Sequence, residues 1–242
     1  HTVSYVKALT ELTLDAKAVR SIGFPLSAAL VERELRIAQG TVVGCNHALE
    51  HGIAFNIAGG THHAFSDRGE AFCLLNDQAI AAQYLINQKK CHKILIVDLD
   101  VHQGNGTAEI FQNNADVITF SMHGQSNYPF RKETSDYDIA LPDKTDDTTY
   151  LSILQETLPE LLNIHRLDFV FYLAGVDILG TDKLGKLGCT LEGCKARDSY
   201  VLGLCKSLGI PVQVSMGGGY SPAIKTIIEA HANTYRVARA LY

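Results

Sequence analysis

Long hydrophobic runs, tryptophan and blocks of like charge are all missing from this 242-residue chain. Its longest apolar stretches fall well short of the roughly 20 residues that cross a bilayer, so we expect no transmembrane helix. No block of lysine or arginine occurs and the net charge is −5, which gives no surface for direct nucleic-acid binding. The chain also shows no signal peptide.

The six cysteines include no C-x-x-C pair. A domain of this size does not depend on disulfides, so we expect reduced thiols and a cytoplasmic protein, or a nuclear one in a eukaryote. Hydrophobic residues make up 46% and charged residues 19% of the chain, as in a globular protein with a sizeable core. The chain opens on His1 without an initiator methionine, so we expect the N-terminal start of the fold to be missing.

Strand-like and helix-like patterns alternate along the chain. The alternation predicts a single α/β domain over residues 1–242 with a mostly parallel sheet. Predicted strands occupy residues 53–57, 94–97, 117–123, 169–174 and 210–215. Predicted helices occupy residues 3–14, 26–38, 41–51, 73–88, 107–111, 150–164, 190–208 and 221–242.

Single residues set several of these boundaries. Gly40 is expected to close the helix over 26–38, and Pro159 to kink or end the helix in which it lies. Ser221 is expected to cap the last helix, with Pro222 as its first residue. Residues 124–146 predict a long polar loop, and loops of this length in compact domains are usually functional or mobile.

The stretch Asp98–His102 (DLDVH) follows directly on the apolar run Ile94–Val97. Residues two apart in an extended chain point the same way, so two carboxylates and an imidazole share one side at a strand end. Such oxygen and nitrogen donors suit a divalent metal. The structural alternative is a strand that becomes polar where it reaches water.

Three more predicted strands end in reactive or flexible residues. Gly59-Gly60 precedes the pair His62-His63, Asp177 follows the strand over 169–174, and Gly217–Gly219 precedes Tyr220. In a parallel sheet these strand ends lie on one edge. A loop-capping role for Asp177 and a packing role for Tyr220 are the structural alternatives.

Together these residues predict metal-assisted hydrolysis of an amide. Asp100, His102 and Asp177 can supply three ligands and leave a fourth position for water. The His62-His63 pair can take a proton from that water and return it to a leaving amine. Tyr220, on a glycine-rich turn, can donate its hydroxyl to a developing oxyanion.

The same residues resemble the zinc-dependent histone deacetylase family, in the family's order and over essentially the whole chain. The motifs are Gly59–Ala64 (GGTHHA), Phe72–Asp77 (FCLLND), Asp98–His102, Gly175–Asp177 and Gly217–Tyr220 (GGGY). His102–Gly106 (HQGNG), Tyr128-Pro129 and Ser135–Asp138 look more like the class IV branch and its bacterial relatives. The resemblance implies a three-layer arginase/deacetylase-like fold, with an eight-stranded, mostly parallel sheet flanked by helices.

The resemblance also implies roles for individual residues. It implies zinc, or iron, on Asp100, His102 and Asp177, with His63 as general base and acid and His62 as its electrostatic partner. Tyr220 would polarise the carbonyl. The substrate would be an acylated lysine on a protein or peptide.

Further implied sites surround this centre. Asp98 would orient His62 and share a structural potassium ion with Asp100, His102 and the carbonyls of Ser121 and Met122. A second potassium is implied near Phe111, Asn114, Val117 and Tyr137. The walls of the tunnel for the acylated lysine would include Phe72, Tyr128, Leu184 and Gly218.

Two residues depart from the family pattern. Asn105 stands where many relatives have an aspartate beside the second histidine, and an amide stabilises an imidazolium less than a carboxylate does. Ala71 replaces a usual glycine before Phe72. Three alternatives stay open: a ureohydrolase with a two-metal cluster, a deacetylase of small amines such as polyamines, and a non-catalytic acyl-lysine binder. Acidic residues at the tunnel mouth would favour the small cationic amine.

Overall fold

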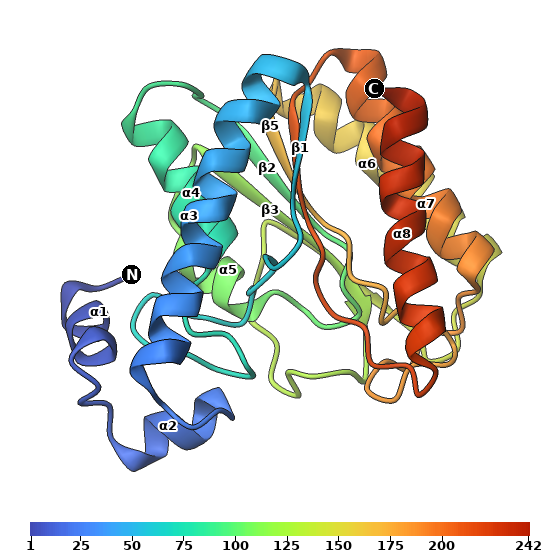
Figure 1. Ribbon diagram of the computed structural model, residues 1–242. Coiled ribbons are helices and arrows are strands. Elements are labelled where there is room, and N and C mark those ends of the chain that lie inside the picture. The colour runs from blue at the N-terminus through green and yellow to red at the C-terminus, as the bar shows by residue number, and fades with distance from the viewer.

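The computed structural model describes all 242 residues as a sheet between two groups of helices (Figure 1). The strands are β1 (Ile53–Asn56), β2 (Ile94–Asp98), β3 (Val117–Gly124), β4 (Tyr137–Leu141), β5 (Phe169–Leu173) and β6 (Val212–Ser215). The helices are α1 (Val3–Thr10), α2 (Ala16–Ile22), α3 (Ala28–His51), α4 (Asp77–Asn87), α5 (Asn105–Phe111), α6 (Asp147–His165), α7 (Leu191–Leu208) and α8 (Ile224–Leu241).

The six strands are ordered β1-β6-β5-β2-β3-β4, and every neighbouring pair is parallel. All carboxyl ends of the strands therefore lie on one edge of the sheet, the lower edge in Figure 1. The predicted count of eight strands is wrong, since the sheet has six. The chain before β1 forms only helices, and the chain after β4 enters α6, so neither edge of the sheet is extended.

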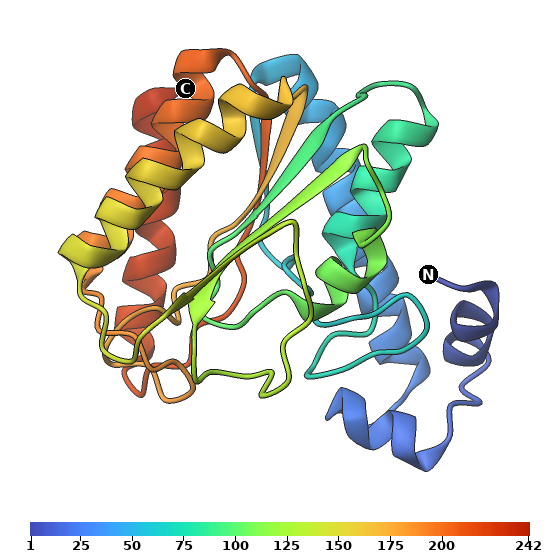
Figure 2. The same cartoon turned by 180° about the vertical axis from the view of Figure 1, so that it is seen from behind.

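Each face of the sheet packs against its own helices (Figure 2). Helices α3, α4 and α5 cover one face, and α6, α7 and α8 cover the other. Side chains alternate between the two cores along each strand: Ile94 and Ile96 of β2 join the first, and Leu95 and Val97 join the second. All four are essentially inaccessible to water, and each such buried side chain contributes about 1.5–3 kcal/mol.

Several predicted boundaries are wrong for local reasons. β4 lies inside the predicted loop over 124–146; it is a short edge strand whose burial alternates, so it carries no continuous apolar run. Gly40 lies inside α3 instead of ending it, and a Cβ there would come within 3.1 Å of Asn56 Nδ2 on β1. Glycine here permits the close approach of helix and strand.

The ends of two later helices also differ from the prediction. α6 runs past Pro159 to His165, so the proline does not end the helix. α8 begins at Ile224 and has no side-chain cap. The Ser221 hydroxyl instead lies 2.8 Å from the Thr181 hydroxyl, and this contact joins the loops that precede α7 and α8.

A third, smaller core holds the N-terminal helices against the loop before α4. It contains Tyr5, Leu9, Ile22, Val31, Leu74 and Leu75. The Tyr5 hydroxyl also donates to the Leu74 carbonyl at 2.7 Å. All six cysteines are buried and unpaired, and none of the helices has the length and hydropathy required to cross a bilayer.

Candidate active site

The residues selected from the sequence come together at the carboxyl ends of four adjacent strands. In the sheet order β1, β6, β5 and β2 are consecutive neighbours, so the loops after them meet. The loop after β1 carries the histidine pair, the loops after β2 and β5 carry the candidate metal ligands, and the loop after β6 carries Tyr220. They line one cavity of about 680 Å³.

Asp77 holds the loop that presents the histidine pair. One of its carboxylate oxygens accepts from the backbone N–H groups of Gly60 and Thr61, both at 2.9 Å. Gly60 has φ +104°, and a Cβ there would lie 2.8 Å from the Gly217 nitrogen, so only glycine fits. The sequence marked Asp77 only as part of a motif at the start of a helix.

The two histidines sit side by side with different partners. Their ring centroids lie 4.1 Å apart. His62 Nδ1 is 2.7 Å from an Asp98 carboxylate oxygen, and His63 Nδ1 is 2.6 Å from Asn105 Oδ1. An amide oxygen only accepts, so His63 donates from Nδ1 and keeps the lone pair of Nε2 free.

Because their surroundings differ, the two histidines have different pKa values. Burial alone would lower the pKa of His62, but the carboxylates of Asp98 and Asp100 raise it to about 9. Burial and the neighbouring His62 hold the pKa of His63 well below its usual value. One ring therefore carries positive charge while the other is neutral, as an acid–base pair requires.

Asp100, His102 and Asp177 form a buried cluster whose donor atoms all lie within 4.8 Å of one another. His102 Nδ1 lies 3.0 Å from one Asp100 oxygen and 3.2 Å from Asp177 Oδ2. The other oxygens accept backbone N–H groups: Gly218 N donates to Asp100 at 2.8 Å, and Val101 N donates to Asp177 at 2.9 Å.

This cluster fits a divalent cation. Asp177 Oδ2 is buried and accepts no hydrogen bond, since its 3.2 Å contact with His102 Nδ1 lacks hydrogen-bond geometry, and this is costly unless something binds it. Burial and the neighbouring Asp100 raise the pKa of Asp177, so the two carboxylates repel one another. A cation among two carboxylates and an imidazole would remove both penalties, and the donor set suits zinc or iron.

A fully buried arginine ties together the two loops that carry these ligands. Arg197 of α7 donates from Nη1 to the Gly175 carbonyl at 2.6 Å and to the Leu99 carbonyl at 3.3 Å. Its charge is balanced by Asp198, whose oxygen lies 2.8 Å from Arg197 Nη2. No sequence pattern indicates this role, because nothing local relates α7 to the loops after β2 and β5.

All four predicted tunnel residues, Phe72, Tyr128, Leu184 and Gly218, line the cavity. The Tyr128 ring stands edge-on to His63 at 5.0 Å. Tyr220 also lines it, and its backbone N–H donates to Asp182 at 2.6 Å. Burial and Asp100 raise the pKa of the Tyr220 hydroxyl, so it stays protonated and able to donate.

The departure at Ala71 coincides with a strained turn. Ala71 and Phe72 both have positive φ, +44° and +69°, where a side chain costs about 1–2 kcal/mol. Their backbone N–H groups donate to the carbonyls of Ser21 and Ile22 at 3.0 and 2.7 Å. The end of α2 therefore holds the turn that places Phe72 in the cavity wall.

The residues named for the first implied potassium site lie near one another. Asp98 pairs in register with Ser121 across β2 and β3, Met122 follows Ser121 along β3, and the Asp100 backbone N–H donates to an Asp98 carboxylate oxygen at 3.1 Å. Around the second implied site, two polar side chains have partners within the protein. Asn114 Oδ1 accepts the backbone N–H groups of Asp116 and Val117, and the Tyr137 hydroxyl lies 2.9 Å from His165.

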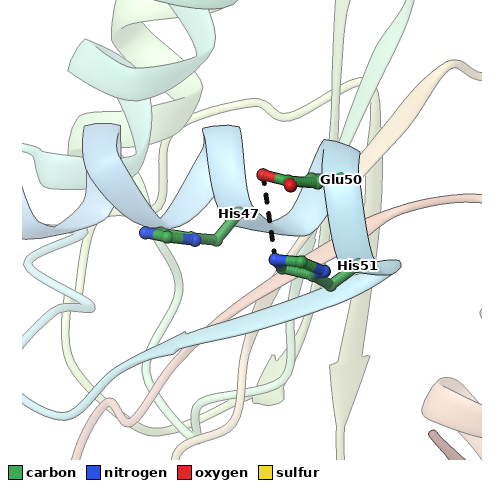
Figure 3. A group of neighbouring side chains, drawn as sticks. All are labelled: His47, Glu50 and His51. Atoms are coloured by element: carbon green, nitrogen blue, oxygen red, sulfur yellow. Dashed lines mark ion pairs between the residues drawn. The ribbon is translucent and has the colours of Figure 1, made fainter.

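A second group of metal-capable side chains was not singled out from the sequence. His47, Glu50 and His51 lie in the last turns of α3 with donor atoms within 4.8 Å of one another. In Figure 3, Glu50 and His51 face one another, and His47 projects one turn earlier. All three are exposed, and the ion pair between Glu50 and His51 is 3.7 Å long.

Comparison with known proteins places this site in a family. A model described as histone deacetylase domain matches residues 1–235. An uncharacterized protein of Picosynechococcus sp. is 48% identical over 100% of this chain and 81% of its own length. Histone deacetylase 2 of Arabidopsis thaliana is 31% identical over 78% of this chain, and histone deacetylase RPD3 of Saccharomyces cerevisiae is 32% identical over 70%.

The chain spans 50% and 40% of the lengths of these two histone deacetylases. The crystal structure of the HDA15 HD domain matches with a TM-score of 0.80 at 23% identity, covering 99% of this chain and 73% of that one. This likeness confirms the predicted deacetylase-like fold. The chain belongs to the histone deacetylase family, a family of hydrolases that act on acetyl-lysine amides.

Proposed function

We propose that the protein hydrolyses the amide of an acylated lysine on a protein or peptide. One observation carries the proposal: the buried Asp100–His102–Asp177 cluster and the His62-His63 pair share the floor of one cavity. Aromatic and aliphatic side chains, among them Phe72, Tyr128 and Leu184, form part of the cavity wall, which suits the extended carbon stem of a lysine side chain. We further propose that residues 1–242 form one catalytic domain.

We propose that Asp100, His102 and Asp177 hold a zinc or iron ion. When bound, the ion would lower the pKa of water and polarise the amide carbonyl. Two carboxylates and one imidazole give the protein three ligands, which leaves a position open. Asp98 and Ser121, with Met122, would hold a structural potassium ion behind this centre.

His63 would act as general base and then as general acid. Its Nδ1–H is held by Asn105, so its free Nε2 lone pair can accept a proton from the attacking water. The same nitrogen can then return that proton to the leaving lysine amine. The positive His62, fixed by Asp98, would favour the negative charge that develops on the tetrahedral intermediate.

Tyr220 would donate its hydroxyl to the carbonyl oxygen as charge develops there. Phe72 and Tyr128 would pack on the lysine stem from two sides, with Leu184 and Gly218 completing the wall. Among the alternatives, a small cationic amine is the least supported, because no carboxylate lines the cavity apart from the two in the metal cluster.

The test is a hydrolysis assay on acetyl-lysine and myristoyl-lysine peptides, with and without chelator and added zinc. We expect turnover that chelator abolishes and zinc restores, and the ratio of the two rates defines the acyl preference. A protein that binds zinc but leaves both peptides intact would contradict the proposal.

A further inference from the structure

The entrance to the cavity is cationic, although acids outnumber bases in the chain by 26 to 21. Three cations line the cavity: Arg20 at the end of α2, Arg33 on α3, and Lys186 in the loop between β5 and α7. Asp100 and Asp177, on the floor, are the only acids among the lining residues. Among the residues that line the cavity, lysine and arginine thus outnumber aspartate and glutamate, the reverse of the chain as a whole.

Two of the three cations are free to bind a substrate. Arg33 is engaged, since its guanidinium lies 2.7 Å from the buried carboxylate of Glu34. Lys186 donates only to the carbonyl and hydroxyl of Ser126, at 2.9 and 3.3 Å. Arg20 forms no ion pair. Both free cations are exposed to water.

The acids beside the entrance already have partners. Asp182 accepts three backbone N–H groups through its two carboxylate oxygens. Glu70 accepts the Tyr128 hydroxyl, and Asp143 accepts the Ser126 hydroxyl. None of these carboxylates forms an ion pair with the free cations; Glu70 instead pairs with Arg68 at 3.7 Å, so Arg20 and Lys186 are available to a charged partner.

Exposed apolar side chains line the cavity together with the free cations. Phe130 is 91% exposed, Leu184 48% and Phe72 47%, and all three line the cavity. A polypeptide lying across the entrance would cover them, whereas a small amine would leave them in water. The surface therefore combines cations and apolar groups around the opening of the tunnel.

We propose that the entrance selects acyl-lysine residues that have acidic neighbours in the sequence, with Arg20 and Lys186 contacting the flanking carboxylates. This inference rests on the proposed function and names its substrate class. Lysine- and arginine-rich segments and acylated polyamines would be repelled. Exposed charge pairs are each worth about a factor of two in binding at low salt. Replacing two basic neighbours by two acidic ones should therefore change kcat/KM about tenfold.

The test compares three acetyl-lysine peptides that differ only in the residues beside the acetyl-lysine: aspartates, glutamines or lysines. We expect the kcat/KM of the metal-loaded enzyme to be about tenfold higher for the aspartate peptide than for the lysine peptide at low salt. The preference should nearly vanish at 1 M salt, where the screening length is about 3 Å. An N-acetylated polyamine should be a poor substrate under both conditions.

Charge-reversing substitutions test which residues cause the preference for the aspartate peptide. R20E and K186E should each reduce it, and the double variant should abolish or invert it, while R20Q and K186Q give intermediate values. R239E, which makes the same change of charge at the far, exposed end of α8, should leave it intact. All variants should keep the wild-type circular dichroism spectrum and melting temperature, which shows that they are folded.

Different results separate this inference from the proposed function. Three results would overturn the inference but not the proposed hydrolase activity: equal rates for the three peptides, a preference for the lysine peptide, or rapid hydrolysis of the polyamine. A preference that survives in the double variant would also overturn it. No chelator-sensitive turnover of any of the substrates would contradict the proposed function itself.

Discussion

The molecule has two clusters of three metal-capable side chains, which share their donor spacing and differ in burial. Both place imidazole and carboxylate donors within 4.8 Å of one another. The cluster of Asp100, His102 and Asp177 is buried, with its carboxylates fixed by backbone N–H groups and one oxygen left without a partner. The His47–Glu50–His51 cluster is exposed, and water can solvate each of its groups (Figure 3).

The difference teaches that donor spacing alone does not make a site. Binding a cation at the exposed cluster only replaces water, and fixing three mobile side chains costs entropy. At the buried cluster, folding has already removed the carboxylates from water and placed them close together. A bound cation offsets the free-energy cost of both. Four experiments, ordered from the largest expected effect to the smallest, test this contrast and the chemistry at the buried cluster.

Removing a buried donor should abolish both metal uptake and turnover. D177A and H102A each take away one of three ligands, and H102A also leaves two carboxylates facing one another. Zinc binding by calorimetry and hydrolysis of acetyl-lysine peptide are the measurements. E50A on the exposed cluster is the matched control and should behave as wild type. Retained turnover in D177A would remove the metal from the mechanism.

Tyr220→Phe should impair catalysis without changing metal binding. Loss of one hydroxyl donor to the developing oxyanion should lower kcat on the order of 10²–10³-fold. Zinc affinity should not change, because Tyr220 is not in the metal cluster. Tyr200→Phe, at a partly buried tyrosine of α7 that does not line the cavity, serves as control. An unaltered kcat would exclude Tyr220 from the reaction.

Asn105→Asp should shift the pH–rate profile with little change in maximal rate. A carboxylate beside His63 Nδ1 stabilises the imidazolium, so the pKa of His63 rises. A base must be neutral to act, so activity, which rises with pH as His63 loses its proton, should appear at higher pH than in the wild type. Measuring kcat/KM from pH 5 to 9 is the test. A profile identical to that of the wild type would mean that His63 is not the titrating base.

The double variant H47A/H51A should change nothing at the active site. We expect wild-type turnover and the same one tight equivalent of zinc, with loss only of any weak additional uptake at high metal concentration. Metal stoichiometry measured by mass spectrometry under non-denaturing conditions checks this. If the variant lost the tight equivalent while D177A kept it, the contrast between the two clusters would be reversed.

The sequence predicted the floor of the site better than its entrance. Asp100, His102 and Asp177 follow apolar strands, and the parallel sheet alone determines that such ends meet. Arg20 and Lys186 reach the cavity only because α2 packs beside the turn at Phe72 and because the loop before α7 folds over the opening. Nothing in the local pattern encodes those contacts.

The errors in the fold have the same origin. β4 was missed because an edge strand needs only one apolar face, and Gly40 was misread because its role is set by Asn56 on a neighbouring strand. The role of Arg197 could not be predicted because its partners, the carbonyls of Leu99 and Gly175, are backbone atoms, and no side-chain pattern in the sequence indicates them. In all three cases, contacts between segments that are distant in the sequence determine the structure.

The small core of Tyr5, Leu9, Ile22, Val31, Leu74 and Leu75 has a consequence for motion. The wall that carries Arg20 and Phe24 is anchored on these six residues, whereas the floor is built into the two large cores of the sheet. Stability is distributed unevenly in proteins, and regions with fewer buried contacts open first. Amide hydrogens of α1 and α2 should therefore exchange faster than those of β2 and β5, and bulky substrates could be admitted by transient opening of one wall while the catalytic floor stays folded.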